Sequence, residues 1–243
     1  MIKALLALLA AGKLGKVLLT GGTMIISVFA YALIYGIWYA VGFVLLIFVH
    51  EMGHFLAARQ RGLNVGAPTF IPFVGAWIEL KDQPHDVETE AWVGLAGPLL
   101  GSVGALVCYY AWKVTDAPIM LALAYAGFFI NLFNLIPVSP FDGGRITAII
   151  SPRVWLLGMP ILIGVFFWHP SPILILMAIL AAPQVWNAFK FDPDAPENQA
   201  YYSVTPAKRL EYATYYIGLA VFLALISYET HELLEQMHAR KGV

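Results

Sequence analysis

The sequence predicts an all-α polytopic membrane protein with six to seven transmembrane helices, a small interfacial β-hairpin or re-entrant segment and one interrupted helix. Three observations predict this fold. The 243 residues are 60% hydrophobic and 12% charged, whereas a soluble domain is about half apolar and about a quarter charged. Several apolar runs are close to the length of about 20 residues that a spanning helix needs. One of these runs contains a cluster of prolines and glycines that must break a helix.

The same composition excludes several classes of protein. Abundant apolar and aromatic residues exclude intrinsic disorder. A net charge of −1 leaves no basic surplus for binding nucleic acid. The single cysteine, Cys108, cannot form an intramolecular disulfide, and its apolar neighbours predict a small buried side chain. The remaining class is a domain embedded in the lipid bilayer.

The first part of the chain predicts two antiparallel spans followed by a hairpin. Residues 1–16 hold an apolar stretch between lysines, which we interpret as an interfacial helix, with a signal peptide as the alternative. Residues 17–58 are roughly twice as long as the hydrocarbon is thick, so we expect a break near residues 40–42. Residues 62–90 combine β-formers with Pro and Gly, which favours a hairpin or re-entrant loop.

Further apolar runs predict the other membrane helices. They cover residues 91–113, 118–150, 154–168, 173–189 and 210–228. The second of these runs contains Pro137, Pro140 and Gly143-Gly144, so its helix is expected to unwind. Residues 190–207 are polar and contain prolines, which predicts a linker before a C-terminal helix over residues 208–243.

The lysines and arginines of the short loops predict the orientation. They precede the first span, end the second, follow the interrupted run and flank the linker, at Lys3, Lys13, Lys16, Arg59, Arg61, Arg145, Arg153, Lys190, Lys208 and Arg209. The opposite loops carry Lys113, Asp116 and His169. We therefore expect a multi-pass protein of a prokaryotic cytoplasmic membrane, with the basic side in the cytoplasm.

Two histidines and a glutamate lie inside the second predicted span, in the sequence His50-Glu51-Met52-Gly53-His54. Ionisable groups at membrane depth are costly and mark functional sites. Residues four apart share one helix face, so both imidazoles can bind one Zn²⁺, with Glu51 beside the metal as general base. The structural alternative is two hydrogen-bonded histidines and a buried glutamate at a contact between helices.

A catalytic zinc site usually needs a third protein ligand. Asp142 is the candidate, because it lies in the interrupted run, where irregular backbone is tolerated if it lines a cavity. The alternative is that its carboxylate caps the helix expected over residues 143–150.

The two motifs together resemble the site-2 protease family of intramembrane zinc metalloproteases. The second motif carries the family's pattern at Asn134, Pro137, Asp142 and Gly143. Phe141 stands where the family often has Leu or Met, and residues 94–98 look like its small-residue segment. The resemblance covers about residues 15–150 and implies a compact form without PDZ or CBS domains.

The resemblance implies a role for each residue of the two motifs. His50, His54 and Asp142 would bind one zinc ion per chain, and Glu51 would activate the attacking water. Asn134 would orient the substrate or stabilise the developing oxyanion. Gly97 and Pro98, in the small-residue segment, would contact the substrate. The family's site lies near the cytoplasm, which agrees with the position of His50, nine residues and about 13 Å before Arg59.

The expected substrate is a transmembrane or membrane-associated helix that must unwind locally before cleavage. The β-rich segment over residues 66–80 could pair with the unwound peptide, with Phe70 and Phe73 in contact with it. The alternative is a simple hairpin on the membrane surface. These expectations divide the chain into a membrane-embedded catalytic domain over residues 17–189, with a metal-binding core over residues 42–150, and the terminal segments described above.

Other functions are consistent with parts of the sequence. A prenyl-protein protease would pair the histidine motif with a downstream Glu-x-x-x-Asp, which the sequence lacks. A transporter or passive metal-binding protein could use the broken helix around Asp142, although it would leave Glu51 without a role. His231, Glu235 and His238 share one face near the C-terminus, where a solvated amphipathic helix end is the alternative to a second metal site.

Overall fold

The computed structural model describes the backbone of residues 2–73, 75–80 and 82–241. The elements follow one another in this order: α1 (Ile2–Tyr35), α2 (Ile37–Gln60), β1 (Val65–Ile71), β2 (Gly75–Leu80), α3 (Val87–Thr115), α4 (Pro118–Asn134), α5 (Asp142–Ala148), the 3-10 helix η1 (Pro152–Leu157), α6 (Gly158–Trp168), α7 (Pro172–Phe189), α8 (Pro196–Tyr202) and α9 (Pro206–Lys241). The chain is therefore mostly helical, as the sequence predicts.

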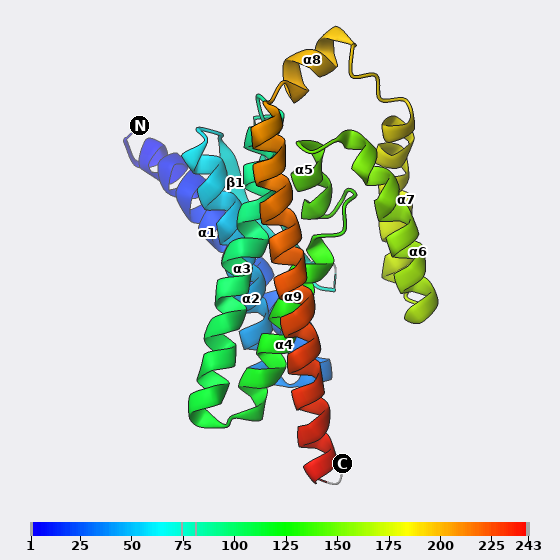
Figure 1. Cartoon of the computed structure of the whole chain (residues 1–243). Coiled ribbons are helices and arrows are strands. Elements are labelled where there is room, and N and C mark those ends of the chain that lie inside the picture. Colours follow the sequence, from blue (N-terminus) through cyan, green and yellow to red (C-terminus); the bar gives the residue numbers. More distant parts are fainter. Residues whose placement is uncertain (1, 74, 81, 242–243) are drawn as a thin grey trace.

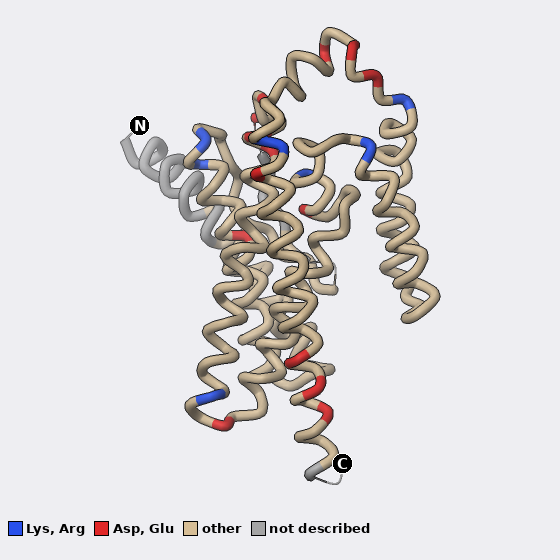
Figure 2. Tube along the Cα trace, viewed as in Figure 1, with Lys and Arg blue, Asp and Glu red and all other residues tan. Residues whose placement is uncertain are grey.

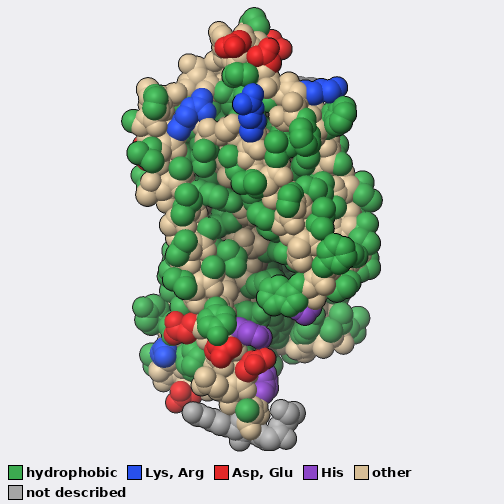
Figure 3. All heavy atoms as spheres, turned by 45° about the vertical axis from the view of Figure 1, so that its right-hand side comes forward, with side chains coloured by type: hydrophobic (Ala, Val, Ile, Leu, Met, Phe, Trp, Pro, Cys, Tyr) green, Lys and Arg blue, Asp and Glu red, His purple; other side chains and the backbone are tan. Residues whose placement is uncertain are grey.

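Five of the described helices are long and apolar enough to cross a membrane, namely α1, α2, α3, α7 and α9. Two shorter apolar helical segments, 118–134 and 152–168, account for the other predicted runs. Large apolar side chains on these helices face outward, with Leu33, Phe167 and Trp168 each at least 79% exposed. Figure 3 shows apolar side chains covering the middle of one face, with the charged ones gathered toward its two ends. Such a surface suits contact with lipid.

The helices α2, α3, α4 and α9 pack side by side, with α1 on one flank (Figure 1). Buried apolar residues join α3, α4 and α9, and they include Leu95, Ala105, Ala124, Phe128 and Leu223. The pair α6 and α7 stands on the other flank, and the short helix α5 lies between this pair and the bundle (Figure 1). A second apolar cluster, which includes Val138, Ile149 and Trp155, holds α5 and η1 against α7.

The first two helices separate at Gly36, so the predicted break near residues 40–42 is wrong by a helical turn. Gly36 has a φ of 82°, a conformation that glycine adopts without steric cost. Hydropathy gives the length of an apolar run but not the position of the turn within it, which here depends on the backbone conformation of Gly36. The helix α1 continues without interruption from Ile2, so the residues expected to form a separate N-terminal helix belong to it. The linker over residues 190–207 contains the short helix α8.

The predicted hairpin is present as two antiparallel strands, with Ile71 opposite Gly75 and Phe70 opposite Ala76. One edge of β1 pairs with β2. Hydroxyl groups of α1 bond to the same strand: Thr20 Oγ1 donates to the Pro68 carbonyl at 2.7 Å, and the Phe70 amide donates to Thr23 Oγ1 at 3.2 Å. The hairpin is thereby fixed on α1. Its location at the membrane interface stays a prediction.

The charged side chains divide along the length of the bundle. Figure 2 shows most Lys and Arg positions at the end where α2 ends and α9 begins, and one at the opposite end, where α3 ends. Lys113 lies in the last turn of α3. The side chains of Lys3, Lys13 and Lys16 lie outside the described part of the structure. The end with most of the arginines and lysines is called the basic end below.

Candidate metal centre

Three side chains from two distant segments meet in the interior. His50 and His54 project from one face of α2, and Asp142 begins α5. The two Nε2 atoms lie 3.1 Å apart. Asp142 Oδ2 lies 3.1 Å from His50 Nε2, and Oδ1 lies 3.2 Å from His54 Nε2. All three residues are at most 8% exposed, so the structure brings together the three predicted metal ligands.

The hydrogen bonds of the outer ring nitrogens fix both imidazole tautomers. His54 Nδ1 lies 2.7 Å from the Val93 carbonyl, which can only accept, so this nitrogen carries the proton. Asn131 Nδ2 donates to the Gly127 carbonyl at 2.7 Å. The Asn131 Oδ1 atom therefore faces His50 Nδ1, which donates to it at 2.7 Å. In the neutral rings, both Nε2 atoms present lone pairs toward each other and toward Asp142.

This donor set fits a zinc ion. Two lone-pair nitrogens and a carboxylate in mutual contact repel one another unless a proton or a metal cation lies among them. Tetrahedral zinc with bonds of about 2.0–2.1 Å places its ligand atoms about 3.3 Å apart, close to the separations found here. Each imidazole also has the outer hydrogen bond that metal-binding histidines usually make. The residues present can hold zinc without rearrangement of their backbone.

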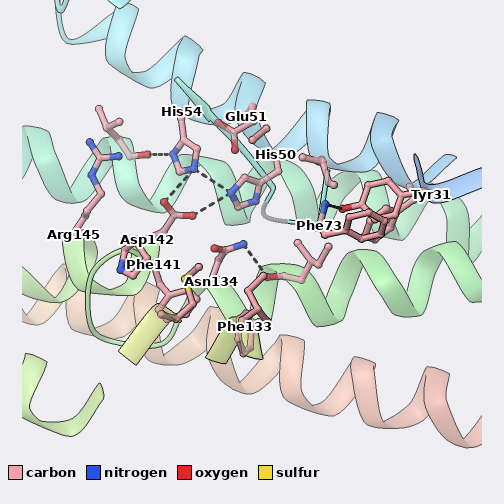
Figure 4. A pocket seen from close by; sticks show the side chains of 18 residues that line it. Tyr31, His50, Glu51, His54, Phe73, Phe133, Asn134, Phe141, Asp142 and Arg145 are labelled. Carbon is pink, nitrogen blue, oxygen red and sulfur yellow. Dashed lines mark hydrogen bonds and ion pairs between the residues drawn. The ribbon is translucent and has the colours of Figure 1, made fainter. Parts of the chain in front are cut away.

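Glu51 lies beside the two histidines and is 6% exposed. Its carboxylate and the two imidazoles offer atoms within 4.8 Å of one another. It also lines a cavity of about 390 Å³ that reaches the metal ligands. Figure 4 shows Glu51 and Asp142 approaching the imidazoles from different sides. Glu51 is thus placed to bond a water molecule in the cavity, as a general base requires.

Asp142 reaches the histidines because α4 ends before it, at Asn134. Irregular backbone continues from there to the start of α5. A β-carbon on Gly143 would meet the carbonyl groups of Leu135 and Ile136, so glycine is required for this close approach. The N-cap position of α5 is Phe141, without a side-chain capping bond, and the Asp142 carboxylate contacts the histidines instead. The capping alternative is therefore wrong.

The helices α2 and α3 approach closely where the site lies. A β-carbon on Gly53 would meet the Ala96 carbonyl, and one on Gly97 would meet the His54 imidazole. A β-carbon on Gly101 would meet the Asn131 amide. Gly97 of α3 therefore makes room for the His54 ring, and Gly101 makes room for Asn131, which bonds His50.

Sequence reasoning missed Asn131, which bonds His50 and is 2% exposed. The signal was a second amide inside an apolar run, one turn before Asn134. Asn134 lines the cavity, and its Nδ2 atom donates to the Ile130 carbonyl at 3.1 Å. Figure 4 shows its amide below the imidazoles. The two asparagines thus differ in position: Asn131 bonds the outer nitrogen of His50, and Asn134 faces the cavity.

The predicted substrate contacts fall in different places. Phe73 lines the cavity, and its backbone amide donates to the Tyr31 hydroxyl at 3.0 Å. Phe70 is 3% exposed and packs in an apolar cluster with Tyr31 instead. Gly97 and Pro98 are buried within α3, and the described lining of the cavity does not include them. Their contact with a substrate stays a prediction.

The C-terminal histidines do not form a second metal cluster among the described residues. In that part of the chain, the group of three potential ligands beside Asp142 is His50, Glu51 and His54, and none is found at the C-terminal histidines. His231 pairs with the exposed Glu235 at 3.6 Å and packs beside the Tyr125 ring. These contacts are those of an exposed helix end.

Residues 38–117 match the sequence profile of peptidase family M50. A zinc metalloprotease of Methanocaldococcus jannaschii is 31% identical over 126 residues, which are 48% of this chain and 36% of that protein. A chloroplast protein of Arabidopsis thaliana, EGY2, is 26% identical over 180 residues, which are 51% of this chain and 32% of that protein. The chain spans about a third of the length of these relatives.

A solved site-2 protease structure from Methanocaldococcus jannaschii superposes with a TM-score of 0.46 at 18% identity, covering 75% of this chain and 87% of that one. The profile match contains the whole histidine motif of α2 and the small-residue stretch of α3. The predicted resemblance is confirmed at this level: the segment that holds His50, Glu51 and His54 matches the profile of peptidase family M50 and is similar to zinc metalloproteases.

Proposed function

We propose that this chain is a membrane-embedded zinc metalloprotease that hydrolyses a peptide bond in a transmembrane or membrane-associated substrate. One observation carries the proposal: two lone-pair nitrogens and a carboxylate converge at one point, with the acid Glu51 beside them in a cavity. His50, His54 and Asp142 would hold one zinc ion per chain.

A bound zinc ion polarises a carbonyl group and lowers the pKa of a water molecule toward about 7. Glu51 accepts the proton of the attacking water and passes it to the leaving amine. Asn134 faces the same cavity and can donate to the substrate carbonyl oxygen, which stabilises the charge that develops there. The buried imidazoles and Asp142 keep bulk water away from one side of the reacting groups.

The substrate peptide must be extended where it is cleaved, since a helical peptide has its carbonyl groups bonded and shielded. Ala76 of β2 and Phe73 at the tip of the hairpin both line the cavity. The edge of β1 away from β2 carries the hydroxyl bonds from α1. An unwound peptide in the cavity would therefore run beside β2 and could pair with it as an added strand.

Five helices are long enough to cross a membrane, and two shorter apolar segments, 118–134 and 152–168, would raise the number of crossings to seven. The helices α1, α2 and α3 alternate in direction, α4 returns from the far end of α3, and α6 and α7 form a further antiparallel pair before α9 (Figure 1). Arg59 in the last turn of α2 lies at the basic end. We infer that this end faces the cytoplasm and that the metal centre lies nearer to it.

The transporter alternative predicts a different dependence on Glu51. A passive ion site needs the ligands but no general base, and it should keep its function when Glu51 is replaced by Gln. The position of Glu51 in the cavity, next to both histidines, favours the protease.

Zinc content in detergent-purified protein tests the metal centre. We expect about one zinc per wild-type chain and a sharp loss in both His54→Ala and Asp142→Ala. Zinc that is retained in Asp142→Ala would remove Asp142 from the ligand set. A wild-type protein that binds no added zinc would overturn the proposal.

Cleavage tests the reaction. A library of single-span model peptides, each with a central Gly-Gly or Gly-Pro, would be incubated with wild type and with Glu51→Gln in micelles, and products would be identified by mass spectrometry. We expect fragments from the wild type, loss of turnover in Glu51→Gln and unchanged zinc content in both. Equal turnover by the two proteins would contradict the role of Glu51.

A further inference from the structure

We propose that Arg145 recognises a carboxylate on the substrate, so that the chain prefers peptides with an acidic residue beside the scissile bond, on the side toward the basic end. The inference rests on the proposed function and narrows its substrate class. Arg145 is neither one of the predicted metal ligands nor one of the expected catalytic residues.

Arg145 lies in the cavity that contains the metal ligands. It is partly buried, one turn after Asp142 in α5, and lines the cavity together with His54, Glu51 and Phe73. Figure 4 shows it on the His54 side of the site, whereas Tyr31 and Phe73 lie beyond His50. The two ends of the cavity therefore differ in chemistry, one cationic and one aromatic.

The stem of Arg145 is held in place by close packing. A β-carbon on Gly94 of α3 would lie 3.0 Å from Arg145 Cβ, so these helices approach as closely as a glycine allows. The stem cannot shift toward α3. The side chain therefore starts from a fixed point beside the cavity, one turn from Asp142.

No carboxylate of the described residues lies within ion-pair distance of this guanidinium group. The ion pairs found among these residues do not include Arg145. Among the nearby carboxylates, Asp142 contacts both histidines and Glu90 accepts from the Tyr201 hydroxyl at 2.7 Å. Glu51 lines the same cavity but forms no ion pair with Arg145 in the described structure. A guanidinium group stays protonated in proteins, so Arg145 offers a positive charge to an anion that enters the cavity.

A substrate carboxylate is the partner that fits best. The planar guanidinium group binds a carboxylate through two parallel hydrogen bonds. Most of the remaining lining is apolar, including Phe43, Ile47, Ile130 and Phe133. An acidic peptide side chain would thus find one charged partner in the cavity. A lipid phosphate could pair with arginine in the same way, but the groups around Arg145 are those of the candidate reaction site.

Binding to an inactive protein tests the preference without relying on cleavage. Zinc-loaded Glu51→Gln would be titrated with three fluorescent single-span peptides in dodecylmaltoside micelles, each with a central Gly-Gly and with Glu, Gln or Lys three residues to one side. We expect the Glu peptide to bind about tenfold more tightly than the Gln peptide and the Lys peptide to bind most weakly. Adding Arg145→Gln should remove the difference between Glu and Gln, and adding Arg145→Glu should favour Lys.

Matched variants separate charge recognition from damage to the fold. Arg153→Gln removes an exposed arginine of η1 and should keep the preference. Arg145→Lys keeps the charge and should retain part of it, and zinc content should be unchanged in every Arg145 variant. Equal affinity for the three peptides, or binding by none of them, overturns the inference. So does a preference that follows added phosphatidylglycerol instead of the peptide charge, which would identify a lipid site.

The proposed function and this inference can fail separately. If the wild type cleaves all the peptides with equal kcat/KM, whatever their charge, the proposed protease activity stands and the recognition role of Arg145 is wrong. If the affinities follow peptide charge but the wild type cleaves none of the peptides, the recognition role of Arg145 stands and the proposed protease activity is wrong.

Discussion

The Nδ1 atom of His50 on α2 donates a hydrogen bond to Asn131 on α4, at 2.7 Å. The amide of Asn131 is oriented in turn by the Gly127 carbonyl and packs against Gly101. The candidate metal ligand His50 is therefore held by a chain of contacts that crosses three helices. The bond keeps the proton on Nδ1 and leaves Nε2 free to bind a metal.

Replacing Asn131 by Leu should weaken zinc binding about 10–100-fold, the usual cost of removing such an outer partner. Asn131→Asp keeps an acceptor for His50 and should retain more of the affinity. Competition with a chelating dye would measure both. Asn134→Ala is the control, because it changes the asparagine that faces the cavity and should lower turnover while zinc affinity stays. Wild-type affinity in Asn131→Leu would show that the bond does not position His50.

Gly97→Ala should displace the His54 ring, because the added methyl group occupies the place of the imidazole. We expect loss of most of the bound zinc, measured by elemental analysis. Gly218→Ala provides the comparison, since a β-carbon there meets nothing within 4 Å. A Gly97→Ala protein with a full complement of zinc would mean that α2 and α3 can separate at no cost to the site.

Arg209 of α9 fastens the end of the segment that carries Asp142. Its guanidinium group donates to the carbonyls of Ile149 and Ile150 at 3.1 and 2.8 Å and to the Tyr202 carbonyl at 3.0 Å. Arg209→Lys cannot reproduce this fork and should cost about 2 kcal/mol of stability, since bonds to charged groups contribute about 1.5–3 kcal/mol each when buried and less when partly exposed. Thermal unfolding in detergent would show a lower Tm. The exposed Arg153→Gln should leave the Tm unchanged.

Two phenylalanines of the hairpin should respond differently to replacement by Ser. Phe73→Ser changes the lining of the cavity, so cleavage should fall while zinc content and Tm remain. Phe70→Ser leaves a hole in the cluster around Tyr31 and should destabilise the protein by about 3–5 kcal/mol, as loss of a buried aromatic ring does. Unchanged cleavage by Phe73→Ser would remove the hairpin tip from the proposed substrate path.

The sequence predicted which residues of the candidate metal centre lie together better than it predicted the arrangement around them. His50, Glu51 and His54 follow from helical spacing alone, and Asp142 follows from the prolines and glycines that must break a membrane helix. Both signals are local. Asn131 escaped because its role depends on which face of α4 meets α2, and two asparagines three residues apart are equally good candidates until the helices are packed.

The turn between the first two helices and the positions of the hairpin phenylalanines also depend on how the segments pack, which local sequence does not specify. Composition and run length identified the membrane helices, yet the turn at Gly36 depends on one backbone conformation. The placement of Phe70 in a core and of Phe73 in a cavity follows from strand alternation and from contact with Tyr31. Neither can be obtained from the β-rich composition of the segment.

The proposed zinc ligands His50 and Asp142 are separated by 92 positions in the chain. A metal ion shared by such distant positions acts as a reversible cross-link, and its binding energy adds to the stability of the folded state. By mass action, free zinc at 100 times its dissociation constant would stabilise the folded form by about 2.7 kcal/mol. The lifetime of this protein in a cell would then rise and fall with the local supply of metal, apart from any effect of that supply on its chemistry.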